Sequence, residues 1–200
     1  MSTSHRIVVG ISGASGAAVG LRIVELLATA DCELHLVVSA AAERTIAYEV
    51  GAKALEHTIE IVHRHHNFND VGASIASGSF RTSGMIVAPC SIRTLSAIAT
   101  GNLDNLLVRA ADVQLKERRR LVLMLRETPL HLGHIRNMAQ VTEIGGIVAP
   151  ISPAFYQRPR SLSEMIDHIA LRAIGLLGLD DLQLSAPEWS DDTPPTCPKI

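Results

Sequence analysis

The sequence has few cysteines, little net charge and no long apolar run, and each shortage excludes a class of protein. Its three cysteines, Cys32, Cys90 and Cys197, are an odd number without C-x-x-C spacing. This argues against a disulfide framework and a structural zinc site, and it suits a reducing cytoplasm. A formal charge of -2 leaves no broad positive field to hold a nucleic-acid backbone.

Membrane and metal signals are also missing. The apolar runs end well before the ~18 residues that a membrane-spanning helix needs, and the first residues lack a signal-peptide pattern. No H-E-x-x-H or D-D-x-x-D motif occurs, and His63, His65 and His66 lie in a polar stretch without other ligands at metal-binding spacing. We therefore expect a cytoplasmic protein that binds no metal, membrane or nucleic acid.

The apolar residues, 47% of a chain of 200, follow a regular alternation. Short apolar runs predict buried strands at residues 6–12, 34–39, 84–89, 120–125 and 146–150. Helical spacing predicts helices at residues 17–30, 41–50, 92–118, 134–144 and 161–178, the last opened by the capping box Ser161-Leu-Ser-Glu164. This alternation predicts an α/β fold, a Rossmann-like doubly wound parallel sheet whose ligands bind at the strand carboxyl ends.

The domain division follows from the same pattern. We expect one domain over residues 1–184. Residues 57–83 are expected to form a polar excursion from it, and the proline-rich residues 185–200 an extended tail.

The first predicted strand ends in Gly10-Ile-Ser-Gly13-Ala-Ser-Gly16 and opens a helix. Small residues and free N–H groups at such a turn allow a phosphate to approach. The alternative is that the glycines only relieve close packing between the strand and the helix. The next strand ends in Ser39-Ala40-Ala41, without the carboxylate that holds the ribose of NAD. With no G-x-G-x-x-G motif either, the pattern favours FMN over a nicotinamide cofactor.

The third predicted strand leads through Ala88-Pro89-Cys90-Ser91-Ile92-Arg93-Thr94 into a helix. Its hydroxyl and N–H groups are either the second half of one cofactor site or an ordinary N-capping loop. We interpret Cys90 as a small buried residue and not as a nucleophile.

Charged residues supply two further candidates. Arg109 and Lys116 lie on the same helix face two turns apart, where two cations either converge on one dianion or form an idle surface pair. Arg126 and Glu127 directly follow the strand at 120–125. This pair is either a ligand for a flavin or phosphate oxygen or a structural ion pair at the sheet end.

Taken in order, GISGASG, CSIRTL, RAADVQLKERRRLVLMLRETPLHLGHIRNM and PAFYQRP resemble the motifs of UbiX-type flavin prenyltransferases. The resemblance implies a flavoprotein domain that assembles as a homododecamer with its sites at subunit interfaces. It also implies transfer of a dimethylallyl group from dimethylallyl monophosphate to N5 and C6 of reduced FMN. The product, prenylated FMN, would pass to UbiD-type decarboxylases.

The same resemblance assigns site residues. The FMN-binding positions match Gly13, Ala14, Ser15, Ser39, Ser91, Ile92, Arg93, Thr94 and Arg126. The dimethylallyl-phosphate positions match Arg109, Lys116, Glu127, Tyr156 and Arg172. The catalytic positions match Ser15, Glu49, Lys116 and Glu127.

These assignments imply a metal-independent reaction. Lys116, Arg109 and Arg172 would neutralise the leaving phosphate in place of Mg²⁺, with a hydrogen bond from Tyr156, while Glu49 relays protons. The chain departs from the family pattern at Ala40, where many members carry lysine. It departs again after Glu49, where Val50-Gly51 stands in place of the common Thr-Asp.

Two alternatives stay open. One is an FMN-dependent cysteine decarboxylase, but that family carries a PxMNxxMW motif where this chain has PLHLGHIRNM. The other is a non-catalytic FMN carrier for a partner decarboxylase, against which Glu49, Lys116 and Arg172 argue.

Overall fold

The computed structural model describes residues 5–30, 32–182 and 184. A six-stranded sheet, in which every strand pairing is parallel, has the order β3-β2-β1-β4-β5-β6. This is the strand order of the doubly wound Rossmann sheet, and it confirms the predicted fold class. The strands are β1 (Arg6–Ile11), β2 (Glu33–Val38), β3 (Arg64–His66), β4 (Gly84–Cys90), β5 (Arg120–Leu125) and β6 (Ile147–Val148).

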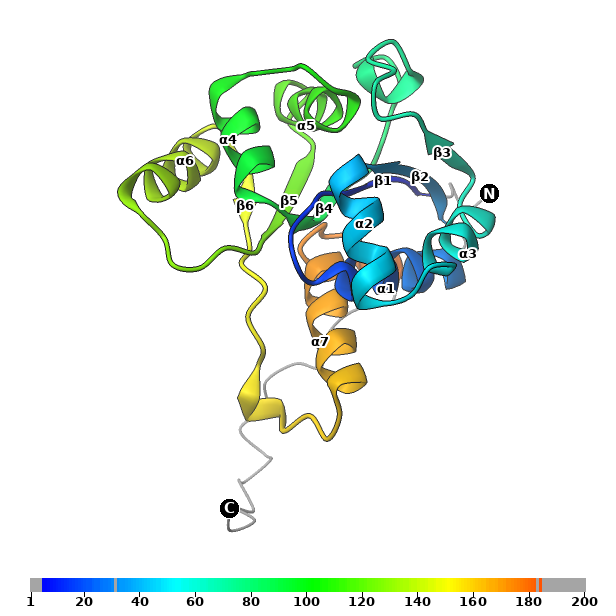
Figure 1. Cartoon of the computed structure of the whole chain (residues 1–200). Coiled ribbons are helices and arrows are strands. Elements are labelled where there is room, and N and C mark those ends of the chain that lie inside the picture. Colours follow the sequence, from blue (N-terminus) through cyan, green and yellow to red (C-terminus); the bar gives the residue numbers. More distant parts are fainter. Residues whose placement is uncertain (1–4, 31, 183, 185–200) are drawn as a thin grey trace.

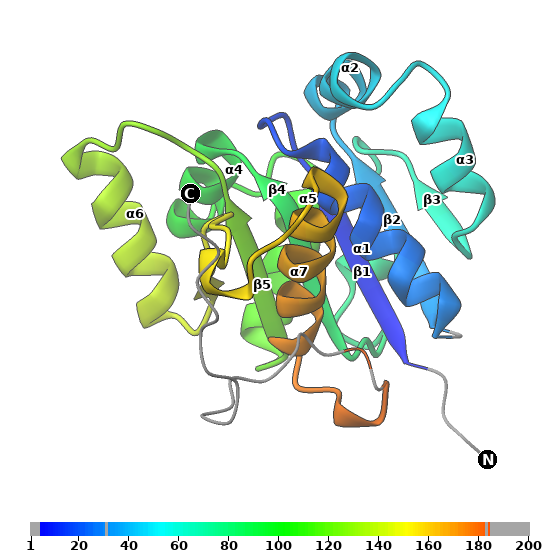
Figure 2. The same ribbon diagram turned by 90° about the horizontal axis from the view of Figure 1, so that it is seen from below.

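Helices cover both faces of the sheet (Figure 1). On one face α1 packs beside α7, and α2 and α3 contact α1 (Figure 2), while α4, α5 and α6 cover the other face. The helices are α1 (Ala17–Thr29), α2 (Ala40–Glu49), α3 (Ala54–Glu60), α4 (Ile92–Thr100), α5 (Leu106–Lys116), α6 (Leu132–Glu143) and α7 (Leu162–Gly175), with short 3-10 turns η1 (Ser74–Ala76), η2 (Phe155–Gln157) and η3 (Asp180–Leu182).

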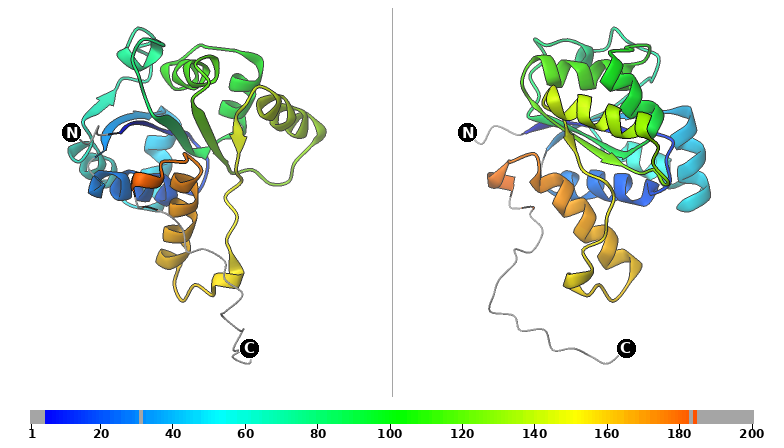
Figure 3. Two further views of the ribbon diagram at one scale, coloured as in Figure 1. Left: turned by 180° about the vertical axis from the view of Figure 1, so that it is seen from behind. Right: turned by 90° about the vertical axis from the view of Figure 1, so that its left-hand side faces the viewer.

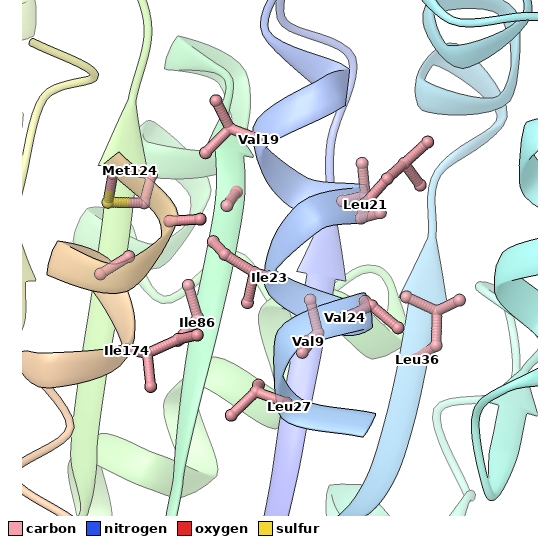
Figure 4. Close-up of a cluster of buried hydrophobic side chains, with 14 of the residues drawn as sticks. Val9, Val19, Leu21, Ile23, Val24, Leu27, Leu36, Ile86, Met124 and Ile174 are labelled. Carbon is pink, nitrogen blue, oxygen red and sulfur yellow. The ribbon is translucent and has the colours of Figure 1, made fainter. Parts of the chain in front are cut away.

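The central strands β1, β2, β4 and β5 are largely apolar because each face of the sheet has its own core. Val9 and Ile86 lie beneath Ile23 of α1 and Ile174 of α7 (Figure 4), and burial of each such side chain contributes about 1.5–3 kcal/mol. A Cβ on Gly20 would lie 2.1 Å from the carbonyl oxygen of Ala88, so α1 sits directly on β4. This close packing holds the loop before α1 over the carboxyl ends of the central strands.

The structure corrects the expectation for residues 57–83. This stretch is not only a polar excursion, because Arg64–His66 form the edge strand β3, which pairs with β2. His66 is buried there, and His35 Nδ1 lies 2.8 Å from its Nε2. Among His63, His65 and His66, His66 is therefore not in a solvated loop, whereas the other two are exposed.

The predicted single helix over residues 92–118 is also wrong, because the chain forms two helices there. Gly101, in the left-handed conformation with φ 66°, ends α4, and the side chain of Asn105 accepts a hydrogen bond from Val108 N–H to begin α5. Buried leucines on both sides of the break continue the helical apolar spacing, so the break between the two helices is not visible in the sequence pattern. The break turns α5 across the sheet next to α4.

The segment between β6 and α7 projects from the body together with the first turns of α7 (Figures 1 and 3). It exposes apolar side chains: Phe155 is 73% exposed, Tyr156 60% and Leu162 71%. At the start of α7, Ser161 Oγ accepts from Glu164 N–H as the capping box predicts, but Glu164 reaches back to Arg160 N–H and not to that of Ser161.

The expected tail at 185–200, including Cys197, lies outside the described residues. Within the described part, no helix has the length and apolar character needed to cross a membrane.

Candidate active site

A cavity of about 560 Å³ opens at the carboxyl ends of β1, β2, β4 and β5, where the strand order changes direction. This volume is typical of a small-molecule site, and the position is where doubly wound sheets bind ligands. Every position assigned to FMN lines it. The lining residues are Ser12, Gly13, Ala14, Ser15, Ser39, Ala40, Ala41, Phe68, Ser91, Ile92, Arg93, Thr94, Arg126 and Glu127.

The loop before α1 is made of small residues because other backbone lies against it. A Cβ on Gly13 would lie 2.4 Å from that of Ala41, so only glycine fits without movement of α2. Gly16 has a left-handed φ of 101° and offers no side-chain cap to α1.

Glu49, at the last residue of α2, supplies the cap that Gly16 lacks. Its Oε2 accepts hydrogen bonds from the backbone N–H groups of Gly16 (2.9 Å) and Ala17 (2.8 Å). A carboxylate is stabilising at a helix N-terminus, where N–H groups are otherwise unpaired. Glu49 therefore holds the loop that lines the cavity, but it is not itself one of the lining residues.

The other helices that begin at the cavity have serine caps. Ser39 Oγ accepts from Ala42 N–H (3.2 Å), and Ser91 Oγ accepts from Thr94 N–H (3.3 Å) and donates to Thr94 Oγ1 (3.1 Å). The N-termini of α1, α2 and α4 thus converge on one space. The partial positive charges of α2 and α4 suit an anion such as a phosphate, whereas Glu49 already pairs with the first N–H groups of α1.

Arg126 and Glu127 complete the wall from the end of β5. Arg126 N–H donates to the Cys90 carbonyl (3.1 Å), whereas its guanidinium is exposed and no described residue pairs with it. Among the described ion pairs none joins Arg126 to Glu127, so the structural ion-pair alternative is not favoured. Arg93 instead pairs with Asp104 at 2.7 Å.

Two residues at the cavity bear on the sequence interpretation. Burial raises the pKa of the Cys90 thiol to about 12, which agrees with an inert small residue. Phe68 lines the cavity from the segment after β3, and its carbonyl accepts from Leu106 N–H at the start of α5. Phe68 carried only a weak signal in the sequence, because it is one of two phenylalanines in the polar stretch at 57–83.

Comparison with known proteins decides the family. Residues 1–169 match the flavoprotein family model. The flavin prenyltransferase UbiX of Thauera aromatica is 56% identical over 175 residues, which is 88% of this chain and 90% of the relative. The chain belongs to the UbiX family of flavin prenyltransferases.

Solved structures of UbiX proteins match nearly the whole chain. A crystal structure of AnUbiX in complex with FMN and dimethylallyl pyrophosphate has a TM-score of 0.89 and 44% identity, and covers 94% of this chain and 98% of that one. A dodecameric FMN-dependent Ubix-like decarboxylase from Escherichia coli O157:H7 has a TM-score of 0.84 and 40% identity, with 92% and 98% covered.

The residues that the UbiX resemblance assigns to dimethylallyl phosphate are not gathered in this single chain. On α5, Arg109 pairs with Asp112 at 2.8 Å and Lys116 pairs with Glu117 at 2.6 Å, so each cation has its own carboxylate. The helix α7, which carries Arg172, covers the face of the sheet opposite α5, and η2, which carries Tyr156, lies on the segment that leads into α7 (Figures 1 and 3). Of the described residues assigned to this substrate, only Glu127 lines the cavity.

No described group of three or more His, Cys, Asp or Glu side chains is placed to hold a metal ion. The rings of His35 and His66 bond to one another, and His35 also bonds to Glu33.

Proposed function

We propose that this chain transfers a dimethylallyl group from dimethylallyl monophosphate to N5 and C6 of reduced FMN, giving prenylated FMN for UbiD-type decarboxylases. The observation that carries the proposal is the cavity formed by every FMN-assigned position, in a chain that is 56% identical to a UbiX flavin prenyltransferase. A non-catalytic carrier and a cysteine decarboxylase are not favoured, because the relative that is 56% identical is named a flavin prenyltransferase.

The donor set of the cavity fits FMN. The helix N-termini at Ser39 and Ser91 offer N–H groups and partial positive charge to a phosphate, and the loop of residues 13–15 leaves space for it. Phe68 and Ile92 offer apolar surface to the flavin ring, and the unpaired guanidinium of Arg126 offers donors to an anionic or carbonyl oxygen. When bound, reduced FMN supplies the atoms N5 and C6 that become alkylated.

The protein supplies charge to the leaving phosphate. Lys116, Arg109 and Arg172 would neutralise it, and Tyr156 would add a hydrogen bond. Asp112 and Glu117 hold Arg109 and Lys116 in place until then. Surface ion pairs of this kind are weak, so a phosphate dianion can displace them.

The phosphate site would be completed by a second copy of the chain. In one chain α7, which carries Arg172 in its last turn, covers the face of the sheet opposite α5, which carries Lys116. Tyr156 lies in η2, on the projecting segment with exposed Phe155 and Leu162. The dodecameric neighbour is consistent with such packing. We therefore propose a homododecamer in which η2 and α7 of one subunit reach the cavity of another. Ser15 and Glu127, which line the cavity, and Glu49 beside it would take part in the chemistry.

Mass spectrometry of the flavin tests the proposed reaction. The protein is incubated anaerobically with reduced FMN and dimethylallyl monophosphate, and a cyclised flavin heavier by one dimethylallyl unit is expected. Unchanged FMN bound to the protein would indicate a carrier instead. The same incubation with EDTA should give the same rate, since protein cations are available for the phosphate, and strict dependence on added divalent metal would remove that role from Lys116 and Arg172.

A further inference from the structure

Ser12 is a buried hydroxyl at the floor of the cavity to which the resemblance assigns no role. It follows β1 directly, is 2% exposed and lines the cavity. Its Oγ donates to the Pro89 carbonyl at 2.9 Å and accepts from Ser91 N–H at 2.7 Å. Its own N–H donates to the same Pro89 carbonyl at 3.1 Å. One side chain therefore joins the end of β1 to the turn that leads from β4 into α4.

This bridge lies just past the point where the two strands stop pairing. The β1–β4 register ends at Gly10 and Val87, and beyond it the strands lead into the separate loops that line the cavity. The hydrogen bonds of Ser12 continue the connection between the strands for a further residue or two. They set how far apart the loop at 13–16 and the start of α4 lie.

The hydrogen-bond inventory of the hydroxyl shows how it acts. A serine hydroxyl has one proton, and here that proton is donated to Pro89. Ser12 is thus not available as a donor to a cofactor while this bond exists. Its acceptor bond fixes Ser91 N–H, and Ser91 in turn caps α4 through Thr94. The effect on any ligand passes through Ser91 and the first turn of α4.

We propose that Ser12 is a positioning residue for FMN, which holds the two cofactor-binding loops at the separation that the cofactor requires. The proposal rests on the proposed function, since FMN is taken as the ligand. Without the hydroxyl, Ser91 N–H and the Pro89 carbonyl each lose a partner at the base of the cavity. A buried group left unpaired is costly, and the loops would shift to find other partners.

The test is titration of the full-length protein with oxidised FMN, followed by flavin fluorescence. Ser12→Ala should weaken FMN binding about 10- to 100-fold, the range expected when a buried hydrogen-bonding group loses its partner. Ser12→Thr, which keeps the hydroxyl, should restore affinity to within a few-fold. The visible circular dichroism of flavin bound at saturation should change in Ser12→Ala and return in Ser12→Thr.

Thr58→Val provides the matched control. Thr58 is an equally buried hydroxyl that donates to the Ala54 carbonyl within α3, away from the cavity. It should lower the melting temperature without changing FMN affinity. Should Ser12→Ala not fold, Ser12→Cys keeps the volume with a weak acceptor and carries the same expectation.

The proposal would be overturned if folded Ser12→Ala bound FMN with wild-type affinity. The same holds for Ser12→Cys if the alanine variant does not fold. Equal weakening in Ser12→Thr and Ser12→Ala would also overturn it, because shape and not the hydroxyl would then matter. A wild-type protein that binds FMN but does not alkylate it would refute the proposed transfer and leave the Ser12 result intact.

Discussion

The cavity contains every residue assigned to FMN, whereas Arg109, Lys116, Tyr156 and Arg172, assigned to the prenyl phosphate, lie outside it. The cofactor half is built from backbone loops fixed by caps and cross-strand hydrogen bonds. The substrate half consists of side chains on α5, η2 and α7, on both sides of the sheet. On the proposed assembly, one chain would suffice to bind FMN, whereas prenyl transfer would require a second copy.

Glu49 tests whether the cofactor half also performs chemistry, and it should give the largest effect. Both of its hydrogen bonds to α1 go to one oxygen, Oε2, so the amide oxygen of glutamine can replace it and keep the cap. We expect Glu49→Gln to retain FMN affinity while ring closure slows by about 10²- to 10⁴-fold, as for loss of a general acid-base group. Stopped-flow absorbance with mass spectrometry of the flavin measures this.

Glu49→Ala is the comparison variant, because it removes the cap as well. It should also weaken FMN binding by releasing the loop at Gly16. If Glu49→Gln forms cyclised product at the wild-type rate while Glu49→Ala loses FMN, the carboxylate is only a helix cap.

Lys116 tests the substrate half, with the next largest effect. Lys116→Ala should slow prenyl transfer by about 10²- to 10³-fold, since a charged donor to the leaving phosphate is lost, and FMN affinity should stay unchanged. Lys53→Ala removes an exposed lysine at the start of α3 and should have no effect. If Lys116→Ala weakened FMN binding as strongly as it slowed prenyl transfer, the division into two halves would be contradicted.

Mixed oligomers sharpen this test. Arg172→Ala should be nearly inactive alone, and coexpression with Lys116→Ala should recover roughly a quarter of the wild-type sites if the two residues come from different subunits. No recovery in mixed oligomers would place both residues in a site formed by one subunit.

Arg126 tests the cofactor half at a smaller scale. Its guanidinium has no described partner and stands at the cavity wall, so Arg126→Ala should weaken FMN binding about 10- to 100-fold through loss of a charge-assisted hydrogen bond. Arg136→Ala, an exposed arginine on α6 that does not line the cavity, is the matched control. Unchanged affinity in folded Arg126→Ala, measured by titration, would remove the residue from the site.

The sequence predicted which loops meet at the cavity, because those loops follow buried parallel strands. Their continuous apolar runs marked where β1, β2, β4 and β5 end, and in a parallel sheet those ends meet at one edge. This was enough to bring Gly13, Ser39, Ser91 and Arg126 together. The same reasoning missed Phe68, since it follows a strand that the pattern did not reveal.

Elements whose burial depends on specific partners were harder to predict. β3 is only Arg64–His66, and its polar residues read as loop, yet His66 is buried against His35. A helix pattern placed Arg109 and Lys116 on one face but gave no sign that Asp112 and Glu117 would pair with them. For the substrate half, periodicity cannot report contacts that another subunit would supply.

The pair His35 and His66 offers the last test, because it should affect the pH dependence of stability and hardly affect FMN binding. His35 Nδ1 lies 2.8 Å from His66 Nε2, and His35 Nε2 lies 3.0 Å from Glu33 Oε1, which also accepts from Arg6. Burial, with the neighbouring His35, lowers the pKa of His66 to about 4, and burial also lowers the pKa of His35. Both rings are therefore neutral in the folded protein at pH 7.

An unfolded histidine has a pKa of ~6.5, so below that pH the unfolded chain binds more protons than the folded one. The free energy of unfolding is therefore unaffected by the protonation of His66 above pH 6.5 and falls as the pH drops toward 4. The loss that His66 causes amounts to about 3 kcal/mol. Urea unfolding between pH 7 and pH 4.5 should show this loss in the wild type and a flatter dependence in His66→Gln. His57→Gln, an exposed histidine on α3, should keep the wild-type slope. Equal slopes in wild type and His66→Gln would show that the acid sensitivity arises elsewhere, and a large fall in FMN affinity of His66→Gln at pH 7 would show that β3 belongs to the cofactor half.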